Sequence, residues 1–107
     1  MGVDLIVLDK NKLDKVLFYV ECECKKVWKD KFTYDSVQFP ERKLKYTQLE
    51  RPTYFIMFNH DFTQYLVVKG SDLAASPLEI VPNKYITYGE KFFKVPLDKV
   101  SFNAFKR

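Results

Sequence analysis

Residues 16–25 constrain the fold more than any other segment, because the two faces of this stretch differ when it is extended. Side chains on a strand point alternately to its two faces. The even positions carry only apolar side chains and cysteines. The odd positions change halfway from Leu17 and Tyr19 to Glu21, Glu23 and Lys25. We therefore expect a strand whose even face lies in the core and whose odd face presents charges where the cover of the sheet ends.

A hairpin brings another carboxylate to the charged end of this strand. Residues 3–8 are an apolar run that contains Asp4, and residues 9–14 are a polar loop. Folding the chain at the centre of the loop places Asp4 opposite Glu21. Moving the centre by one residue places it opposite Glu23. Opposed Cβ atoms are about 5 Å apart, so either register predicts a carboxylate cluster.

The rest of the chain contains more strand patterns than helix patterns. Further strands are expected at residues 54–58, 64–69, 86–88 and 91–95 and within 96–105, with a turn at Gly89. Short helices are expected from Pro40 to about Glu50 and at 72–75, with Ser71 as the cap, and residues 26–38 are expected to be a loop. The predicted fold class is α/β (mixed, α+β-like) around a largely antiparallel sheet.

Length and composition favour one cytoplasmic domain over residues 1–107. The chain has 107 residues, 47% of them hydrophobic, which is enough for one core and too few for two domains. No apolar run is long enough to cross a membrane, and the N-terminus does not resemble a signal peptide. Cys22 and Cys24 alternate on one strand, a poor arrangement for a disulfide, and are expected to be buried apolar residues in a reducing compartment.

The formal net charge of +4 is a mild bias toward polyanions such as DNA. Basic side chains gather in two clusters along the chain. The residues expected to contact nucleic acid are Lys26, Lys29, Arg42, Lys43 and Lys45. Solvated faces rich in lysine are common, so the charge alone favours nucleic acid only modestly.

The predicted carboxylate cluster suits a hard divalent cation. Two carboxylates at this spacing can converge on Mg²⁺ or Mn²⁺, and three would repel each other unless a cation or Lys25 compensates them. A metal held by Asp4 and Glu23 would activate a water molecule, and Lys25 would meet developing negative charge on a phosphate.

These residues resemble the PD-(D/E)XK nuclease superfamily, which includes restriction endonucleases and Holliday-junction resolvases. Asp4 would be the first motif aspartate, and the segment from Glu23 to Lys25 the (D/E)XK element. The resemblance implies a restriction endonuclease-like sheet and metal binding by Asp4, Glu23 and the Cys24 backbone carbonyl, with Glu21 as a further acid. It also implies that Lys25 is catalytic and that the chain is a DNA endonuclease. A phage-like setting would suit a nuclease of this size.

The resemblance also bears on the ends of the chain and on partners. Family members usually carry a helix before the first motif strand, whereas this chain begins at the strand. Exposed strand edges could be covered by a second copy in a homodimer. The alternative function is a catalytically inactive nuclease-fold module that binds nucleic acid or a protein.

Simpler structural roles compete with these functional ones. The charged odd positions could be a solvated strand end with a weak Glu–Lys pair. Trp28 and Tyr34 could stack on bases, although Trp28 is better explained as a cap on the core. His60 is expected to be an exposed loop residue.

Overall fold

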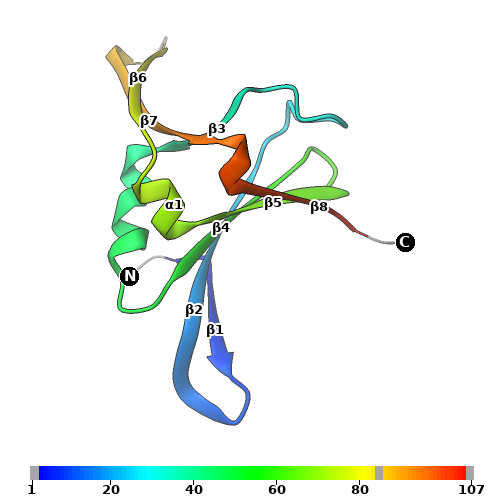
Figure 1. The fold of residues 1–107 in the computed structure, drawn as a ribbon, viewed down its shortest axis with the longest axis vertical. Helices are drawn as coiled ribbons and strands as arrows, with labels where there is room; N and C mark the ends of the chain where they lie inside the picture. Colours follow the sequence, from blue (N-terminus) through cyan, green and yellow to red (C-terminus); the bar gives the residue numbers. More distant parts are fainter. Residues whose placement is uncertain (1–2, 84–85, 106–107) are drawn as a thin grey trace.

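The computed structural model describes residues 3–83 and 86–105, and these form two β-sheets with short helical segments at one side (Figure 1). The larger sheet has five strands in the order β1 (Leu5–Asp9), β2 (Lys12–Cys24), β4 (Thr53–Phe58), β5 (Gln64–Lys69) and β8 (Val100–Ala104). β2 and β4 are parallel, and the other neighbours are antiparallel.

The smaller sheet has the strand order β3 (Ser36–Pro40), β7 (Ile86–Pro96) and β6 (Leu78–Asn83), all antiparallel. The helical segments are η1 (Glu41–Gln48), α1 (Gly70–Ala74) and η2 (Leu97–Lys99), of which η1 and η2 are 3₁₀-helices. Mixed, mostly antiparallel sheets with few helices confirm the predicted fold class.

The core lies between the two sheets. Strand β4 alternates buried and half-buried residues, and its buried side chains Phe55 and Met57 face the second sheet. Phe39 of β3 packs against Phe55 with ring centroids 5.5 Å apart. Trp28 is 1% exposed and belongs to this core, as expected. The remaining buried members of the core are Val37, Leu66, Val68, Leu73, Phe93 and Val95.

Strands β1 and β2 extend beyond the rest of the molecule as a two-stranded hairpin (Figure 1). The hairpin pairs Val7 with Phe18 but then shifts register, so that Leu8 lies opposite Val16. Its apolar side chains are only partly covered, and Leu13 near the tip is 71% exposed. β1 is also the edge strand of the larger sheet, which leaves its outer backbone groups unpaired within the sheet.

The predicted hairpin at Gly89 is wrong, because β7 runs straight through this residue and pairs with both β3 and β6. Gly89 has φ +76°, and a Cβ there would lie 2.8 Å from the carbonyl oxygen of Val81. The glycine therefore permits a close approach between strands rather than a reversal of the chain. Likewise, part of the expected 26–38 loop is strand β3, whose partner β7 is distant in sequence.

Both predicted helices are found close to their expected positions. η1 begins after Pro40 and ends before Pro52, with a 3₁₀ conformation that the sequence did not indicate. α1 begins at Gly70 with Lys69 at its N-cap, so the predicted Ser71 cap is wrong. Gly70 lies against the Thr53 carbonyl, where a Cβ would be only 2.8 Å away, and this contact places the start of the helix. No helix within residues 3–83 and 86–105 is long and apolar enough to cross a membrane.

Candidate functional site

Two hydrogen bonds join Asp4 to the charged part of β2. The backbone N–H of Asp4 donates to Glu21 Oε2 at 2.8 Å, and the N–H of Cys22 donates to Asp4 Oδ2 at 2.7 Å. The next residue pair of the two strands is Leu5 and Val20, so the register of the hairpin brings Asp4 and Glu21 together. The structure thus places Asp4 beside Glu21, as in the first of the two predicted registers.

Lys43, from η1, lies between the two glutamates. Its Nζ is 3.0 Å from Glu21 Oε1 and 3.4 Å from Glu23 Oε1. The side chains of Glu21 and Lys43 are only 3% and 13% exposed, whereas that of Glu23 is 24% exposed. The solvated strand end considered from the sequence is therefore wrong for Glu21, and Lys43 is an ion-pair partner of both glutamates.

Lys25, the expected cation of the cluster, points elsewhere. Its ammonium nitrogen lies 4.5 Å from the centre of the Tyr34 ring, an arrangement typical of a cation–π contact. The positive charge next to Glu21 and Glu23 is instead that of Lys43, which is far from β2 in sequence. The one relevant signal in the sequence is Pro40, which begins a helix in the connection between β2 and β4.

The main core lies against the odd face of β2 and not, as predicted, against the even face, although Val20 on the even face is also buried. On the odd face, Glu21 pairs with Phe55 and Glu23 with Met57, and both partners belong to the core. On the even face, Cys22 is half-buried and Cys24 is exposed, so the expectation that both are buried is wrong. Both are free thiols.

Electrostatics keep Lys43 charged. Burial lowers the pKa of Lys43, but the hydrogen bond to Glu21 and the negative charges of Glu23 and Glu21 outweigh it, so the pKa is raised overall. The pKa of the neighbouring Cys22 thiol is also raised, which for a thiol favours the neutral form. Burial raises the pKa of Cys22, and the charges of Asp4 and Glu21 raise it further. Cys22 is therefore a poor nucleophile at neutral pH.

The cluster opens into a cleft of about 520 Å³. Glu23 and Lys43 line one part of it, and Lys25 and Arg42 bring further positive charge. Arg42 also lies 3.5 Å from Glu90 on β7. The other lining residues are Cys24, Gln38, Pro40, Met57 and Phe92. Three cationic side chains and one carboxylate thus line the cleft, and this balance of charge suits an anionic ligand.

The other residues expected to contact nucleic acid lie apart from the cleft. Lys26 and Lys29 are exposed on the segment between β2 and β3. Lys45 is exposed on η1, with its nitrogen 5.1 Å from the centre of the Tyr46 ring. His60 is exposed in the β4–β5 turn, as expected.

Carboxylates such as those of Asp4, Glu21 and Glu23 can bind a hard cation, but here the two glutamates contact Lys43. Within the parts of the chain that the structure describes, no three His, Cys, Asp or Glu side chains are arranged to hold a metal. Asp4 and Glu21 each accept a backbone N–H, and a carboxylate has about four lone-pair sites, so these bonds leave capacity for a further ligand. Oxygen donors of this kind are those that Mg²⁺ prefers.

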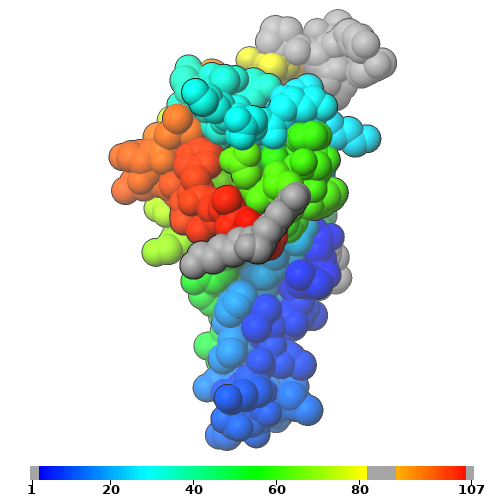
Figure 2. Space-filling model, turned by 90° about the vertical axis from the view of Figure 1, so that its right-hand side faces the viewer, coloured from blue at the N-terminus to red at the C-terminus, as the bar shows by residue number. Residues whose placement is uncertain are grey.

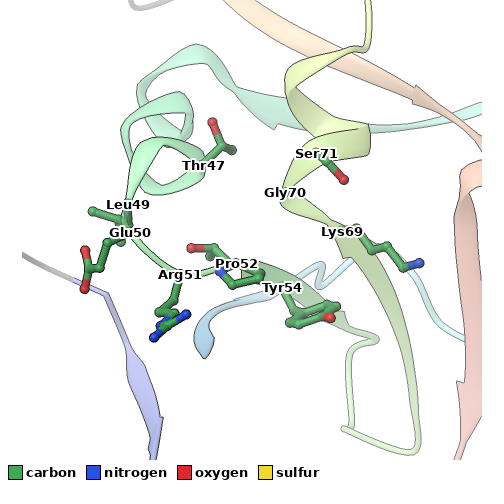
Figure 3. A pocket seen from close by; sticks show the side chains of 10 residues that line it. Thr47, Leu49, Glu50, Arg51, Pro52, Tyr54, Lys69, Gly70 and Ser71 are labelled. Carbon is green, nitrogen blue, oxygen red and sulfur yellow. The ribbon is translucent and has the colours of Figure 1, made fainter. Parts of the chain in front are cut away.

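A second cavity, of about 430 Å³, lies where η1, β4 and α1 meet (Figure 3). Arg51 and Lys69 lie on opposite sides of Tyr54 in this view. Glu50, at the edge of the cavity, accepts a hydrogen bond from the hydroxyl of Tyr19, two residues before Glu21 on β2. The cavity thus adjoins a contact between β2 and the residues that follow η1.

Comparisons with protein-family models, with curated proteins and with solved structures found no match for this chain.

Proposed function

We propose that this chain is a metal-dependent DNA endonuclease-like domain that hydrolyses phosphodiester bonds. The observation that supports this most is the buried ion cluster of Glu21, Lys43 and Glu23 beside Asp4, at the mouth of a cationic cleft. Removing charges from water is costly, and such arrangements are concentrated at functional sites. The free thiols of Cys22 and Cys24 suit a reducing compartment such as the cytoplasm.

The proposed mechanism assigns a role to each charged group. Asp4 and Glu23 would hold Mg²⁺ or Mn²⁺, with the backbone carbonyl of Cys24. When bound, the ion would supply an activated water and neutralise charge on the phosphate. Lys43 orients the glutamates, and it takes the place beside them that the family pattern gives to Lys25.

Lys25 and Arg42 have a different role in this proposal. Both line the cleft, so they would bind the phosphates that flank the bond to be cut. The resemblance names Lys25 as catalytic, but its ammonium group contacts Tyr34, and in this proposal it is a group that positions the substrate. The Lys25 contact with Tyr34 is on the surface and can be exchanged for a phosphate contact at little cost.

The test uses a double variant, Asp4→Asn with Glu23→Gln, which removes two charges and keeps both side-chain shapes. The asparagine amide retains an oxygen that can accept the Cys22 N–H, so the hairpin is preserved. Calorimetric titration with Mg²⁺ and Mn²⁺, followed by incubation with plasmid and branched DNA, should show metal binding and cleavage by the unmodified chain only. Absence of both from the unmodified chain would leave the alternative, an inactive module that binds nucleic acid or a protein.

We also propose that a second copy of the chain pairs along the edge of β1. Antiparallel pairing about a two-fold axis at Val7 places Asp4 of one copy opposite Lys10 of the other, and Ile6 opposite Leu8. The pairing thus joins opposite charges and covers side chains that are exposed, 50% for Ile6 and 42% for Leu8. Light scattering should detect a dimer that Ile6→Lys abolishes and Leu13→Lys, at the hairpin tip, preserves. A monomeric unmodified chain would overturn this.

A further inference from the structure

Phe62, in the turn between β4 and β5, has a backbone conformation that a bulky residue rarely adopts. Its φ is +60°, in the left-handed region that favours glycine, and its side chain is 56% exposed. A phenylalanine in this conformation is strained, and strain of this kind gathers at binding and catalytic sites. The position therefore presents a large ring to solvent at a cost in stability.

The turn is built to hold this conformation. Asn59 is fully buried, and its amide nitrogen donates to the Lys29 carbonyl and to Thr63 Oγ1, both at 3.0 Å. Its side-chain oxygen accepts the N–H of Gln64 at 2.9 Å, and its backbone carbonyl accepts the N–H of Phe62. These bonds determine the path of the chain on both sides of Phe62.

Phe62 belongs to a group of four rings at this end of the larger sheet. Phe58 lies 5.2 Å from Phe62 between ring centroids, and its ring is stacked on that of Phe105 at 8° and 6.4 Å. Tyr65 lies 4.8 Å from Phe105. Phe105 is 52% exposed, so two of the four rings present much of their surface to solvent. We call these four residues the aromatic patch.

A lysine-rich segment packs on the turn that carries Phe62. The segment of residues 25–31 packs on the β4–β5 turn, as the cyan and green surfaces show in Figure 2. This contact includes the bond from Asn59 to the Lys29 carbonyl and one from the His60 N–H to the Trp28 carbonyl at 2.9 Å. The exposed cationic side chains of the segment are Lys26, Lys29 and Lys31.

The acidic groups nearby are already engaged. Asp61 accepts a hydrogen bond from the Thr63 hydroxyl at 2.7 Å and lies 3.5 Å from His60. Asp30 accepts one from the side chain of Gln64 at 3.3 Å. These bonds come from neutral groups and leave both carboxylates charged, but the four lysines of residues 25–31 outnumber Asp30 and Asp61, so the segment and the turn together keep a net positive charge.

We propose that the aromatic patch and the lysines beside it bind single-stranded nucleic acid. Exposed rings stack on unpaired bases, and flanking lysines contact the backbone phosphates, which is how strands are bound without sequence preference. A duplex buries its base faces in its own stack, so it cannot use the rings. The inference goes beyond the proposed cleavage, because it involves neither the carboxylate cluster nor a metal.

The decisive variant is Phe62→Gly, which removes the ring and also relieves the strain at φ +60°. Fluorescence anisotropy with a labelled oligo-dT strand, in EDTA, should show about 5- to 150-fold weaker binding than that of the unmodified chain. Phe62→Trp, which keeps a ring in place, should bind as the unmodified chain does. Thermal unfolding should show that Phe62→Gly is folded and at least as stable.

A lysine variant tests the charge separately. Lys29→Gln should weaken binding and reduce the slope of log affinity against log salt by about 0.7. The control is Lys15→Gln, an equal change of charge at an exposed position of the projecting hairpin, which should leave binding unchanged. The variant with Asp4→Asn and Glu23→Gln should also bind normally, so loss of cleavage and loss of binding are distinguished.

Two results would overturn the inference. One is an affinity of Phe62→Gly for the strand equal to that of the unmodified chain. The other is equal binding of the single strand and of a duplex of the same length, since attraction by charge alone would give that result.

Discussion

The ammonium nitrogen of Lys43 lies 3.0 Å from a carboxylate oxygen of Glu21, and both side chains are largely shielded from water. Together with the contact from Lys43 to Glu23, the pair connects η1 to β2. An ion pair at this depth is harmful when only half of it is present, because the remaining charge has no partner and little water.

Lys43→Met should therefore destabilise the fold by about 3 kcal/mol, since it leaves Glu21 without its partner. The matched control is Lys25→Met, which loses only a surface contact with Tyr34 and should cost under about 1 kcal/mol. Urea unfolding of both variants measures the difference. Adding Glu21→Gln to Lys43→Met should restore part of the lost stability. If stability is not restored, the unpaired charge of Glu21 is not the cause of the loss.

The same pair predicts a dependence on alkaline pH. The pKa of Lys43 is raised in the folded chain, despite burial, by its bond to Glu21 and the charge of Glu23. A raised pKa means that the pair contributes fully below the ordinary value of 10.5 and that its contribution is lost as pH rises through the folded value. The stability gap between the unmodified chain and Lys43→Met should narrow only above about pH 10.5. A gap that narrows at neutral pH would argue against this assignment.

The bond between Tyr19 and Glu50 predicts a dependence on acid pH. The hydrogen bond from Tyr19 lowers the pKa of Glu50 below its ordinary 4.5, while the bond to Glu50, followed by burial, raises the pKa of Tyr19. The contribution of Glu50 is therefore present above pH 4.5 and is lost as pH falls through its folded value. Tyr19→Phe should lower the unfolding temperature at pH 7, and the deficit should shrink in acid. Tyr34→Phe, at an exposed ring, serves as the control.

The two cysteines should differ in reactivity toward iodoacetamide. Cys24 is exposed, whereas Cys22 is half-buried and its pKa is raised by burial and by the charges of Asp4 and Glu21. Because the thiolate is the reactive form, alkylation at pH 8 should occur first at Cys24. Mass spectrometry of Cys22→Ser and Cys24→Ser will follow each thiol alone. Faster labelling of Cys22 would contradict the burial of its thiol and its raised pKa.

The local part of the site could be predicted from the sequence. Alternation along β2 and a polar loop before it were enough to place Asp4 opposite either Glu21 or Glu23, and the structure has the first of these registers. The helical segment after Pro40 was also recognisable from proline chemistry. These features depend on neighbours within a few residues of each other or across one turn.

The contacts between segments distant in sequence could not be predicted. Which face of β2 lies against the main core depends on its parallel partner β4 and on η1, and the unbroken apolar row on the even face suggested the opposite answer. The pairing of Lys43 with Glu21 depends on the same crossover, so charge pattern alone suggested the nearer Lys25. Gly89 was misinterpreted for a related reason: a glycine required by a neighbouring strand has the same appearance in sequence as one required by a turn.

The position of Lys43 has a consequence for the order of folding. β1 and β2 can pair as soon as both are made, whereas Lys43 belongs to the connection that must cross over before β4 can align parallel to β2. Closing so long a segment is slow compared with forming a hairpin. Until that step, Glu21 remains hydrated and without its lysine. The charged cluster is therefore assembled late. A chain in which Lys43 contacts Glu21 has already completed the crossover that aligns β4 with β2.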